Sequence, residues 1–147
     1  MNAIELLKQD HREMEKLLEK LDSTTDRGVK AREELFTRIK KEMTAHEAIE
    51  EEIFYPALKK HAEAKEIVLE GFEEHHVVDL LLGELEQVSY DDETWGAKAS
   101  VMKENVEHHI EEEEDDMFDK AEKLLDDDEL ESLGERMQNR KKEALGS

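Results

Sequence analysis

The sequence predicts an all-α protein: an antiparallel, up-down-up-down four-helix bundle with a short C-terminal fifth helix. Apolar residues recur at three- and four-residue steps almost throughout the chain, which is the period of an amphipathic helix. The 147 residues contain a single proline, Pro56, and no run of alternating β-branched residues that would indicate strands. The turn-rich stretches between helical segments are short, so consecutive helices are expected to lie antiparallel.

The first helix is predicted over about residues 2–21. One face of it carries Ile4, Leu7, His11, Met14, Leu18 and Leu21. Residues 22–28 are rich in cap and turn residues and predict a loop. The second helix covers about residues 29–54, with a continuation past Pro56 left open. Because proline lacks a backbone N–H, a kink or a break is expected near Phe54.

The third helix is predicted over about residues 64–88, although Gly71 near its start is a weak helix former. The fourth helix covers about residues 94–125, after a second short loop. Three aspartates at 126–128 suit the N-terminal cap of a fifth helix over about residues 129–144.

Composition limits the classes of function. Lys plus Arg number 21 and Asp plus Glu number 42, so the formal net charge is −21, which argues against nucleic acid and anionic membranes as partners. The absence of cysteine excludes disulfides, thiolate metal sites and a cysteine nucleophile. No apolar run approaches the roughly 20 residues that span a bilayer, and no signal-peptide pattern opens the chain, so a cytoplasmic protein is expected. Without a linker, residues 1–147 are expected to form one domain, with the bundle in about residues 2–125.

The histidines carry the chemical signal. At 100° per residue, one histidine of each bundle helix falls on or near the apolar stripe. These are His11, His46, His75 and His109. Glu50 and Glu113 follow the second and fourth of them by four residues, on the same helix face. A carboxylate on an apolar stripe is costly unless a positive charge meets it. Two such carboxylates at the same spacing indicate a metal site.

The two halves of the chain repeat this pattern. His11 and His75 are 64 residues apart, and His46 and His109 are 63 residues apart. A bundle with approximate twofold symmetry would bring four histidines and two glutamates together in its core. Imidazole and carboxylate ligands without sulfur suit Fe, Mn or Zn, and two shared carboxylates suit a pair of ions about 3.5–4 Å apart.

These residues resemble the hemerythrin family, specifically the bacterial hemerythrin-like HHE cation-binding domains, over essentially the whole chain. The resemblance rests on Asp10-His11, on the run from His46 to Pro56, on Glu73-Glu74-His75-His76 and on the run from His108 to Glu114. It implies a non-haem diiron centre, bridged by an oxo or hydroxo group, in a four-helix bundle that binds O2 or a related small ligand. Carried over by position, the terminal ligands are His11, His46, His75 and His109, and the bridging carboxylates are Glu50 and Glu113.

The sequence departs from the oxygen carriers of that family in two places. Where those carriers have a second histidine on the third helix, this chain has Asp79, which is an extra ligand, a partner of a ligand or a solvated residue. Their closing His and Asp, five residues apart, are replaced here by His109 and Glu113. Fewer imidazoles leave more open coordination positions, which favours oxidation, peroxide chemistry or iron exchange over reversible O2 carriage.

Several positions keep alternatives. His76 and His108 stand beside the predicted ligands and replace them if the helices are rotated. His61 is interpreted as a surface residue near a helix end. Tyr55 and Phe118 are expected to line the core and limit access to the metals. A further alternative for the whole set is that the inward histidines and glutamates only pair with each other.

Three classes of function fit these observations. The first is a diiron protein that binds or senses O2, NO or peroxide, or that holds iron. The second is a diiron oxidoreductase with catalase- or peroxidase-like turnover, whose electrons would come from outside because no flavin or nucleotide motif occurs. The third is a metal-free acidic helical interaction module, with Arg140-Lys141-Lys142 as its candidate surface. The sequence does not decide whether the protein is an enzyme and identifies no protein partner.

Overall fold

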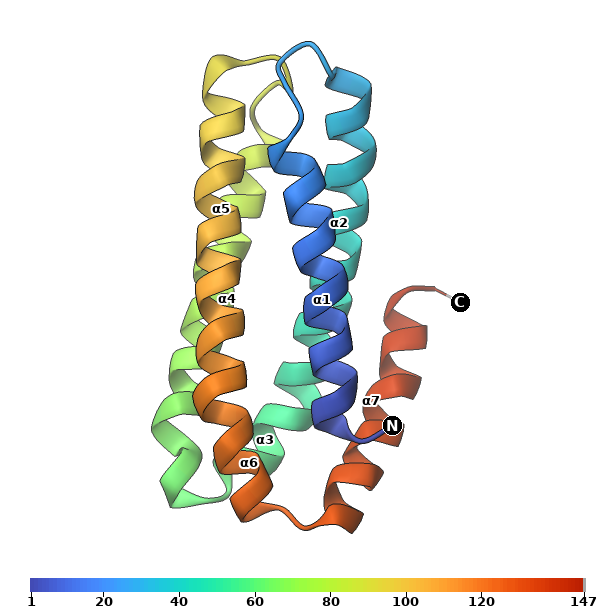
Figure 1. Cartoon of the computed structure of the whole chain (residues 1–147), viewed down its shortest axis with the longest axis vertical. Helices are drawn as coiled ribbons and strands as arrows, with labels where there is room; N and C mark the ends of the chain where they lie inside the picture. Colours follow the sequence, from blue (N-terminus) through green and yellow to red (C-terminus); the bar gives the residue numbers. More distant parts are fainter. Residues whose placement is uncertain (147) are drawn as a thin grey trace.

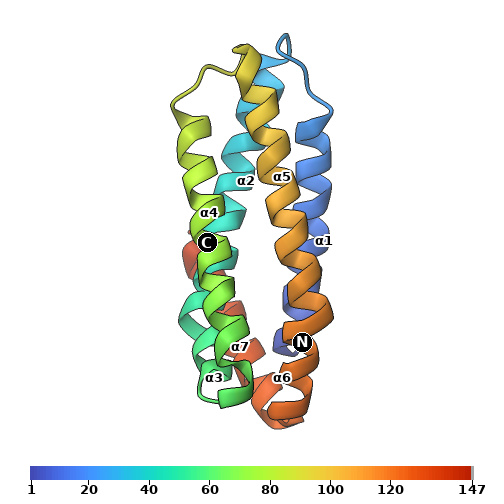
Figure 2. The same ribbon diagram turned by 90° about the vertical axis from the view of Figure 1, so that its left-hand side faces the viewer.

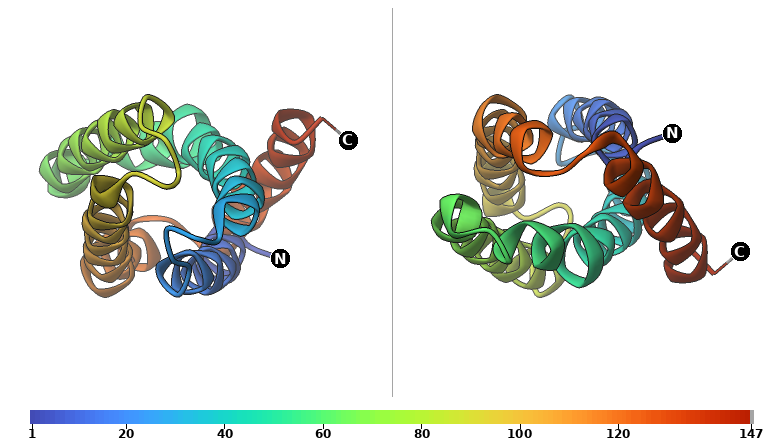
Figure 3. Two further views of the ribbon diagram at one scale, coloured as in Figure 1. Left: turned by 90° about the horizontal axis from the view of Figure 1, so that it is seen from above. Right: turned by 90° about the horizontal axis from the view of Figure 1, so that it is seen from below.

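The computed structural model describes residues 1–146, which form four long helical rods with a further helix against their side (Figure 1). The rods are built on α1 (Ala3–Asp22), α2 (Val29–Ile49), α4 (Lys65–Glu86) and α5 (Glu93–Glu112). The loops that join α1 to α2 and α4 to α5 lie at the same end of the bundle (Figures 1 and 2). Seen along the long axis, the rods surround a common interior, and α7 (Asp127–Ala144) lies outside the ring (Figure 3). The predicted all-α bundle with a fifth helix is confirmed.

The distortion expected near Phe54 is a π-helical turn rather than a break. After α2 the chain continues through η1 (Glu50–Phe54) into α3 (Tyr55–Lys59). The Tyr55 N–H bonds to the carbonyl of Glu50, five residues back, and Pro56 lies in the first turn of α3. Proline has no N–H to donate to the preceding turn, so one backbone hydrogen bond of the rod is missing at this position. The rod nevertheless stays helical past its only proline.

A second π-helical turn shows that proline is not the cause of the first. After α5, the chain passes through η3 (Glu113–Met117) into α6 (Phe118–Leu124). The position equivalent to Pro56 is Asp119, yet the Phe118 N–H again bonds to a carbonyl five residues back. Both turns begin at the glutamate of a His-x-x-x-Glu motif. Because single π-turns inside α-helices occur mostly at functional sites, we relate both to the centre described below.

The bundle interior consists of two apolar clusters in the described part of the chain. The cluster at the loop end contains Phe36, Trp95 and Met102, among others. Trp95 is fully buried there, and its indole N–H donates to the carbonyl of Leu85 at 3.1 Å. The opposite cluster contains Phe54, Tyr55 and Phe118, together with Leu130, Leu133 and Met137 from α7. Polar residues lie in the band between the two clusters.

The helix termini differ slightly from the predicted ranges. Asn2 caps α1 in a capping box with Glu5, so the helix begins at Ala3. Asp126 alone is the cap of α7, which therefore begins two residues earlier than predicted. A short 3-10 turn, η2 (Ala62–Ala64), precedes α4. None of the helices in residues 1–146 is long and apolar enough to cross a membrane.

The last helix packs closely against the beginning of the chain. A Cβ atom at Gly134 would collide with the backbone carbonyl of Met1, so only glycine allows this approach. Arg140 donates to both carboxylate oxygens of Glu52 at 3.1 Å, and Lys141 lies 2.5 Å from Asp10 Oδ1. The basic segment considered as a docking surface is thus partly engaged within the chain.

Candidate metal centre

Six buried polar side chains meet halfway along the bundle, between the two apolar clusters. Each long rod contributes one histidine, and η1 and η3 each begin with a glutamate. The glutamates are 0% and 1% exposed, and none of the histidines exceeds 8%. The six are His11, His46, Glu50, His75, His109 and Glu113, the residues that the sequence predicts as metal ligands.

The six side chains fall into groups that share both glutamates. Within residues 1–146, one group is His11, His46, Glu50 and Glu113, and the other is Glu50, His75, His109 and Glu113. In each group the potential ligand atoms all lie within 4.8 Å of one another. Two carboxylates common to two pairs of histidines are what a pair of bridged cations requires.

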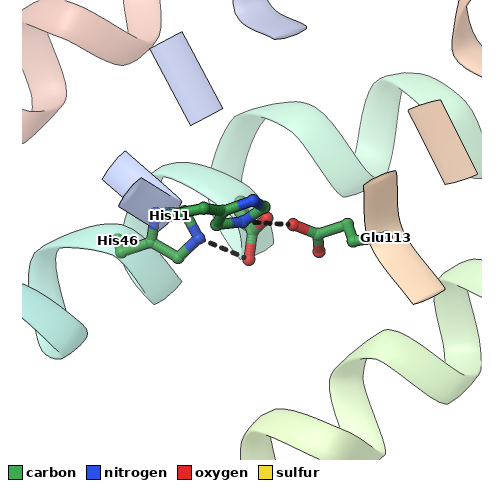
Figure 4. A group of neighbouring side chains, drawn as sticks. His11, His46 and Glu113 are labelled. Carbon is green, nitrogen blue, oxygen red and sulfur yellow. Dashed lines mark ion pairs between the residues drawn. The ribbon is translucent and has the colours of Figure 1, made fainter. Parts of the chain in front are cut away.

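All four imidazoles turn Nε2 towards the shared carboxylates. Figure 4 shows His11 and His46 beside each other, with the Glu113 carboxylate reaching towards them. The Nε2 distances are 2.9 Å for His75 and 3.3 Å for His46 to Glu50 Oε1, and 3.0 Å for both His11 and His109 to Glu113. The inward histidines and glutamates therefore do contact one another, as the alternative without a metal also requires.

A second ring of carboxylates holds the other nitrogen of each of the four inward histidines. The pairs are Asp10 with His46 (3.1 Å), Glu51 with His75 (2.7 Å), Glu74 with His109 (2.5 Å) and Glu114 with His11 (2.7 Å), each through Nδ1. A carboxylate on Nδ1 fixes the orientation of the ring and the tautomer that leaves Nε2 free for a metal. The outer carboxylates therefore keep the Nε2 atoms of the four imidazoles directed at the centre.

The outer carboxylates repeat between the two halves of the chain. In each case an acid on one rod holds the histidine of the next rod around the bundle. Asp10 and Glu74 directly precede a histidine, and Glu51 and Glu114 directly follow a shared glutamate. The repeat in the sequence thus corresponds to an approximate twofold arrangement of contacts. Sequence reasoning gave these four acids no role, although each adjoins a predicted ligand.

Opposing effects set the charges of the centre. Burial on its own would lower the pKa of His46, but Glu50 and Asp10 outweigh it and raise that pKa to about 10. Glu50 and Glu51 likewise raise the pKa of His75 to about 9 against the effect of burial. Burial would raise the pKa of Glu50, yet His46 beside it holds that pKa well below its usual range. Without a metal ion, protonated His46 and His75 therefore lie against ionised Glu50.

Four inward atoms show that this pairing leaves the centre incomplete. They are His11 Nε2, His46 Nε2, Glu50 Oε2 and Glu113 Oε1, which are buried and make no hydrogen bond within residues 1–146. His11 Nε2 and Glu113 Oε1 lie 3.0 Å apart, but their directions do not suit a hydrogen bond. Leaving buried polar atoms unsatisfied is costly. Nitrogen and oxygen atoms that converge in this way fit a shared cation.

Comparison with known proteins agrees with this site. A family model described as the hemerythrin HHE cation-binding domain matches residues 2–121. This chain belongs to the hemerythrin HHE family. The fold is similar to the crystal structure of a hemerythrin HHE cation-binding domain-containing protein from Mycobacterium kansasii, with a TM-score of 0.89 and 29% identity over 99% of this chain and 88% of that chain. Comparison with curated protein sequences finds no match.

The two halves of this HHE domain differ at one aromatic position. The Tyr55 hydroxyl donates to Glu113 Oε2 at 2.6 Å and lies 3.3 Å from His75 Nε2. A Cβ at Gly71 would approach that hydroxyl to 3.0 Å, so the glycine makes room for it. The equivalent residue in the other half, Phe118, stacks on the ring of His11 at 5.8 Å. One histidine pair therefore faces a hydroxyl group and the other an apolar ring.

Tyr55 and Phe118 line the core as the sequence predicts, with exposures of 0% and 1%. The contact of the Tyr55 hydroxyl with the centre was not predicted. Two signals for it are present in the sequence. Tyr55 aligns with Phe118 between the halves, which isolates the hydroxyl as the difference, and Gly71 leaves space in an otherwise leucine-rich helix.

A cavity reaches the HHE centre from the side opposite to these aromatic rings. It has a volume of about 30 Å³, and all four inward histidines line it. Its remaining wall includes Met14, Met43, Val78 and Val106 from the loop-end cluster. This is room for about two water-sized molecules. A diatomic ligand or peroxide could occupy it next to the histidines.

The three alternative metal ligands considered in the sequence, His76, His108 and Asp79, lie outside both groups of buried ligands. His76 and His108 have side chains 64% and 66% exposed, and they pair with nearby glutamates. Asp79 is exposed on α4. Its carboxyl lies beside Glu47, whose pKa is raised to about 8 by burial and by Asp79. His61 is half-buried near the end of α3 and belongs to neither group.

Proposed function

We propose that this HHE domain is a non-haem diiron protein that binds O2 or a related small ligand, NO or peroxide, in the bundle core. In this proposal His11 and His46 hold one ion, His75 and His109 hold the other, and Glu50 and Glu113 bridge them. The observation that carries it is the sharing of both carboxylates between the two histidine pairs. The sulfur-free nitrogen and oxygen donor set favours iron, with manganese and zinc as alternatives.

In this proposal, the residues around the ions control access to them, orient the ligands and supply a proton. Bound iron would supply an open coordination position at which a small ligand can bind and exchange electrons. Apolar side chains of the cavity exclude bulk water and larger molecules from that position. The outer carboxylates keep each imidazole in place while the inner charge changes. The Tyr55 hydroxyl provides a proton donor on the opposite side of the centre.

The test is a ligand response that depends on the cavity. Protein loaded anaerobically with ferrous iron should change its near-ultraviolet and visible absorption on exposure to O2, NO or azide. The substitution Val106→Leu narrows the cavity without touching a metal-facing residue, so iron content should stay the same while the response slows. An iron-loaded protein that ignores all three ligands, or a narrowed variant that responds at the original rate, would refute small-molecule binding here.

Peroxide turnover is the second candidate, and Tyr55 favours it. A hydroxyl 2.6 Å from Glu113 and beside His75 can pass protons within the centre. Disproportionation of two peroxide molecules to O2 and two waters needs no outside electron donor. Iron-loaded protein should then release O2 from peroxide, as an oxygen electrode would record, and Tyr55→Phe should slow the release. Equal O2 release by metal-free protein would rule out a role for the centre.

A further inference from the structure

Glu47 is a buried carboxyl that the fold does not require. It directly follows His46 and is 8% exposed, whereas the equivalent residue after His109 is Ile110. An apolar side chain therefore packs well at this position of the bundle. Glu47 Oε2 is buried and makes no hydrogen bond within the described residues. Since burying such a group costs free energy, a function is the simplest reason for a carboxyl here.

Acidic side chains connect Glu47 to the solvent between α2 and α4. Asp79 is exposed on α4, and its carboxyl contacts that of Glu47. Glu51 lies one turn after Glu47, with a side chain that is 36% exposed. Ligand atoms of Glu47, Glu51 and His75 lie within 4.8 Å of one another. Carboxyl groups at an exposed and at a half-exposed position thus both adjoin the buried carboxyl of Glu47.

The inner end of this series reaches the metal centre. Glu47 lines the same cavity as the four inward histidines. Glu50 follows Glu47 by three residues, so the two carboxylates lie on adjoining parts of one helical face. A cation held at Glu47 would be next to Glu50 and His75, which face the inner position. Of the other acids in that wall, Glu13 and Glu42 are exposed or half-buried in the described structure, and Asp10 is engaged by His46 and Lys141.

We propose that Glu47, Glu51 and Asp79 form an entry site for a divalent cation on its way to the centre. The inference rests on the dimetal centre proposed above. Carboxylate oxygens attract hard and borderline divalent cations, and a cation relieves the repulsion between neighbouring carboxylates. The entry site binds more weakly than the centre because His75 Nδ1 is engaged by Glu51 and its Nε2 faces inward. Weak binding lets the ion move on.

The rate of cobalt loading tests this proposal, because Co²⁺ becomes visible by its absorption when histidines and carboxylates bind it. Metal-free protein is mixed with Co²⁺ in a stopped-flow instrument. The isosteric variant Glu47→Gln should load about tenfold more slowly, because the amide cannot bind the passing cation as a carboxylate does. Its final content should remain equal to that of the unsubstituted protein. Asp79→Asn should also slow loading, and this surface variant leaves the interior unchanged.

Glu42→Gln is the matched control. It makes the same carboxyl-to-amide change on the same helix and the same cavity wall, outside the group of Glu47, Glu51 and His75. It should load at the original rate. The entry site is refuted if Glu47→Gln keeps that rate, if Glu42→Gln slows loading equally, or if Glu47→Gln holds less Co²⁺ at saturation. If Glu47 and Asp79 only share a proton and bind no cation, Glu47→Gln should keep the original loading rate. If the unsubstituted protein takes up no Co²⁺, the dimetal centre itself fails.

Discussion

Each inward histidine turns Nε2 towards a shared glutamate and has an outer acid at its Nδ1. Glu50 and Glu113 are each used by both histidine pairs, so they are the residues on which both metal positions depend. The outer acids only orient one ring each. The glutamates and the outer acids are therefore expected to differ in the effect of their removal.

Replacement of a shared glutamate should remove metal. Glu50→Ala takes a ligand from both positions and leaves the histidines beside a cavity, so at least one ion per chain should be lost. The metal-loaded variant should also melt at a lower temperature, because metal binding energy contributes to folding. Metal analysis and thermal unfolding measure both effects. His61→Gln, which lies outside the centre, should change neither; an unaltered metal content in Glu50→Ala would remove the bridging assignment.

The pKa values predict that metal affinity rises with pH. In the metal-free protein His46 and His75 have pKa values of about 10 and 9, so both carry a proton at pH 7 to 8. A metal ion binds neutral imidazole, and these two protons must leave when it binds. Each ion displaces one of them, so the apparent affinity for each ion should increase by up to about tenfold per pH unit below pH 9. Competition titrations between pH 7 and 9 measure the slope, and a flat profile would contradict the protonated resting state.

The single hydroxyl difference between the halves gives a third prediction. Tyr55→Phe keeps the ring in the space beside Gly71 and copies the residue found at position 118, so the fold should be unaffected. It removes the donor to Glu113. The hydroxyl also lies beside His75 and His109, so the ion at that pair should bind about tenfold more weakly, the cost of a charge-assisted hydrogen bond. Calorimetric titration resolves the two ions; equal loss at both, or at neither, would show that the hydroxyl does not distinguish the positions.

Among the helices, α7 is the element that the repeat between the two halves of the bundle does not include. Lys141 on α7 lies 2.5 Å from Asp10 Oδ1, and Asp10 Oδ2 lies 3.1 Å from His46 Nδ1. Burial would raise the pKa of Asp10, but His46 and Lys141 together lower it. The fifth helix thus reaches one metal position through two contacts, while Glu74, the counterpart of Asp10, pairs with His109 in the other half.

Loss of Lys141 should therefore weaken the metal position of His46. In Lys141→Met, Asp10 loses the partner that fixes it, and the affinity for one ion should fall by about tenfold, as is usual for residues that orient a ligand. The control is Arg140→Met, which breaks the neighbouring contact of α7 with Glu52 but leaves Asp10 alone. If both variants lose affinity equally, the effect comes from packing of α7 and not from the contact with Asp10.

For the whole molecule, the periodicity of apolar residues was enough to predict the bundle and the residues that meet inside it. His11, His46, His75 and His109 could be recognised because a polar residue on an apolar stripe has to face the interior. The π-helical turns could not be predicted from Pro56, since the second turn has Asp119 at that position. Such turns arise where a helix must offset its side chains, which depends on contacts between helices.

The outer carboxylates were missed for a related reason. Asp10 and Glu74 stand beside histidines in the sequence, but each of them holds a histidine on another rod. That pairing depends on how the rods are rotated about their axes, and a chain with 42 acidic residues offers many equivalent candidates. The Tyr55 contact likewise depends on the space left by Gly71 on a different helix.

The central claim is that the two histidine pairs hold two metal ions between shared carboxylates, and metal analysis tests it most directly. Protein purified without a metal-affinity column should contain about two ions per chain, iron by this account. Its absorption should change on anaerobic reduction and return on exposure to air. A chain that carries no metal, and whose spectrum and stability do not respond when iron is added back, would contradict the account and leave the inward histidines as structural ion pairs.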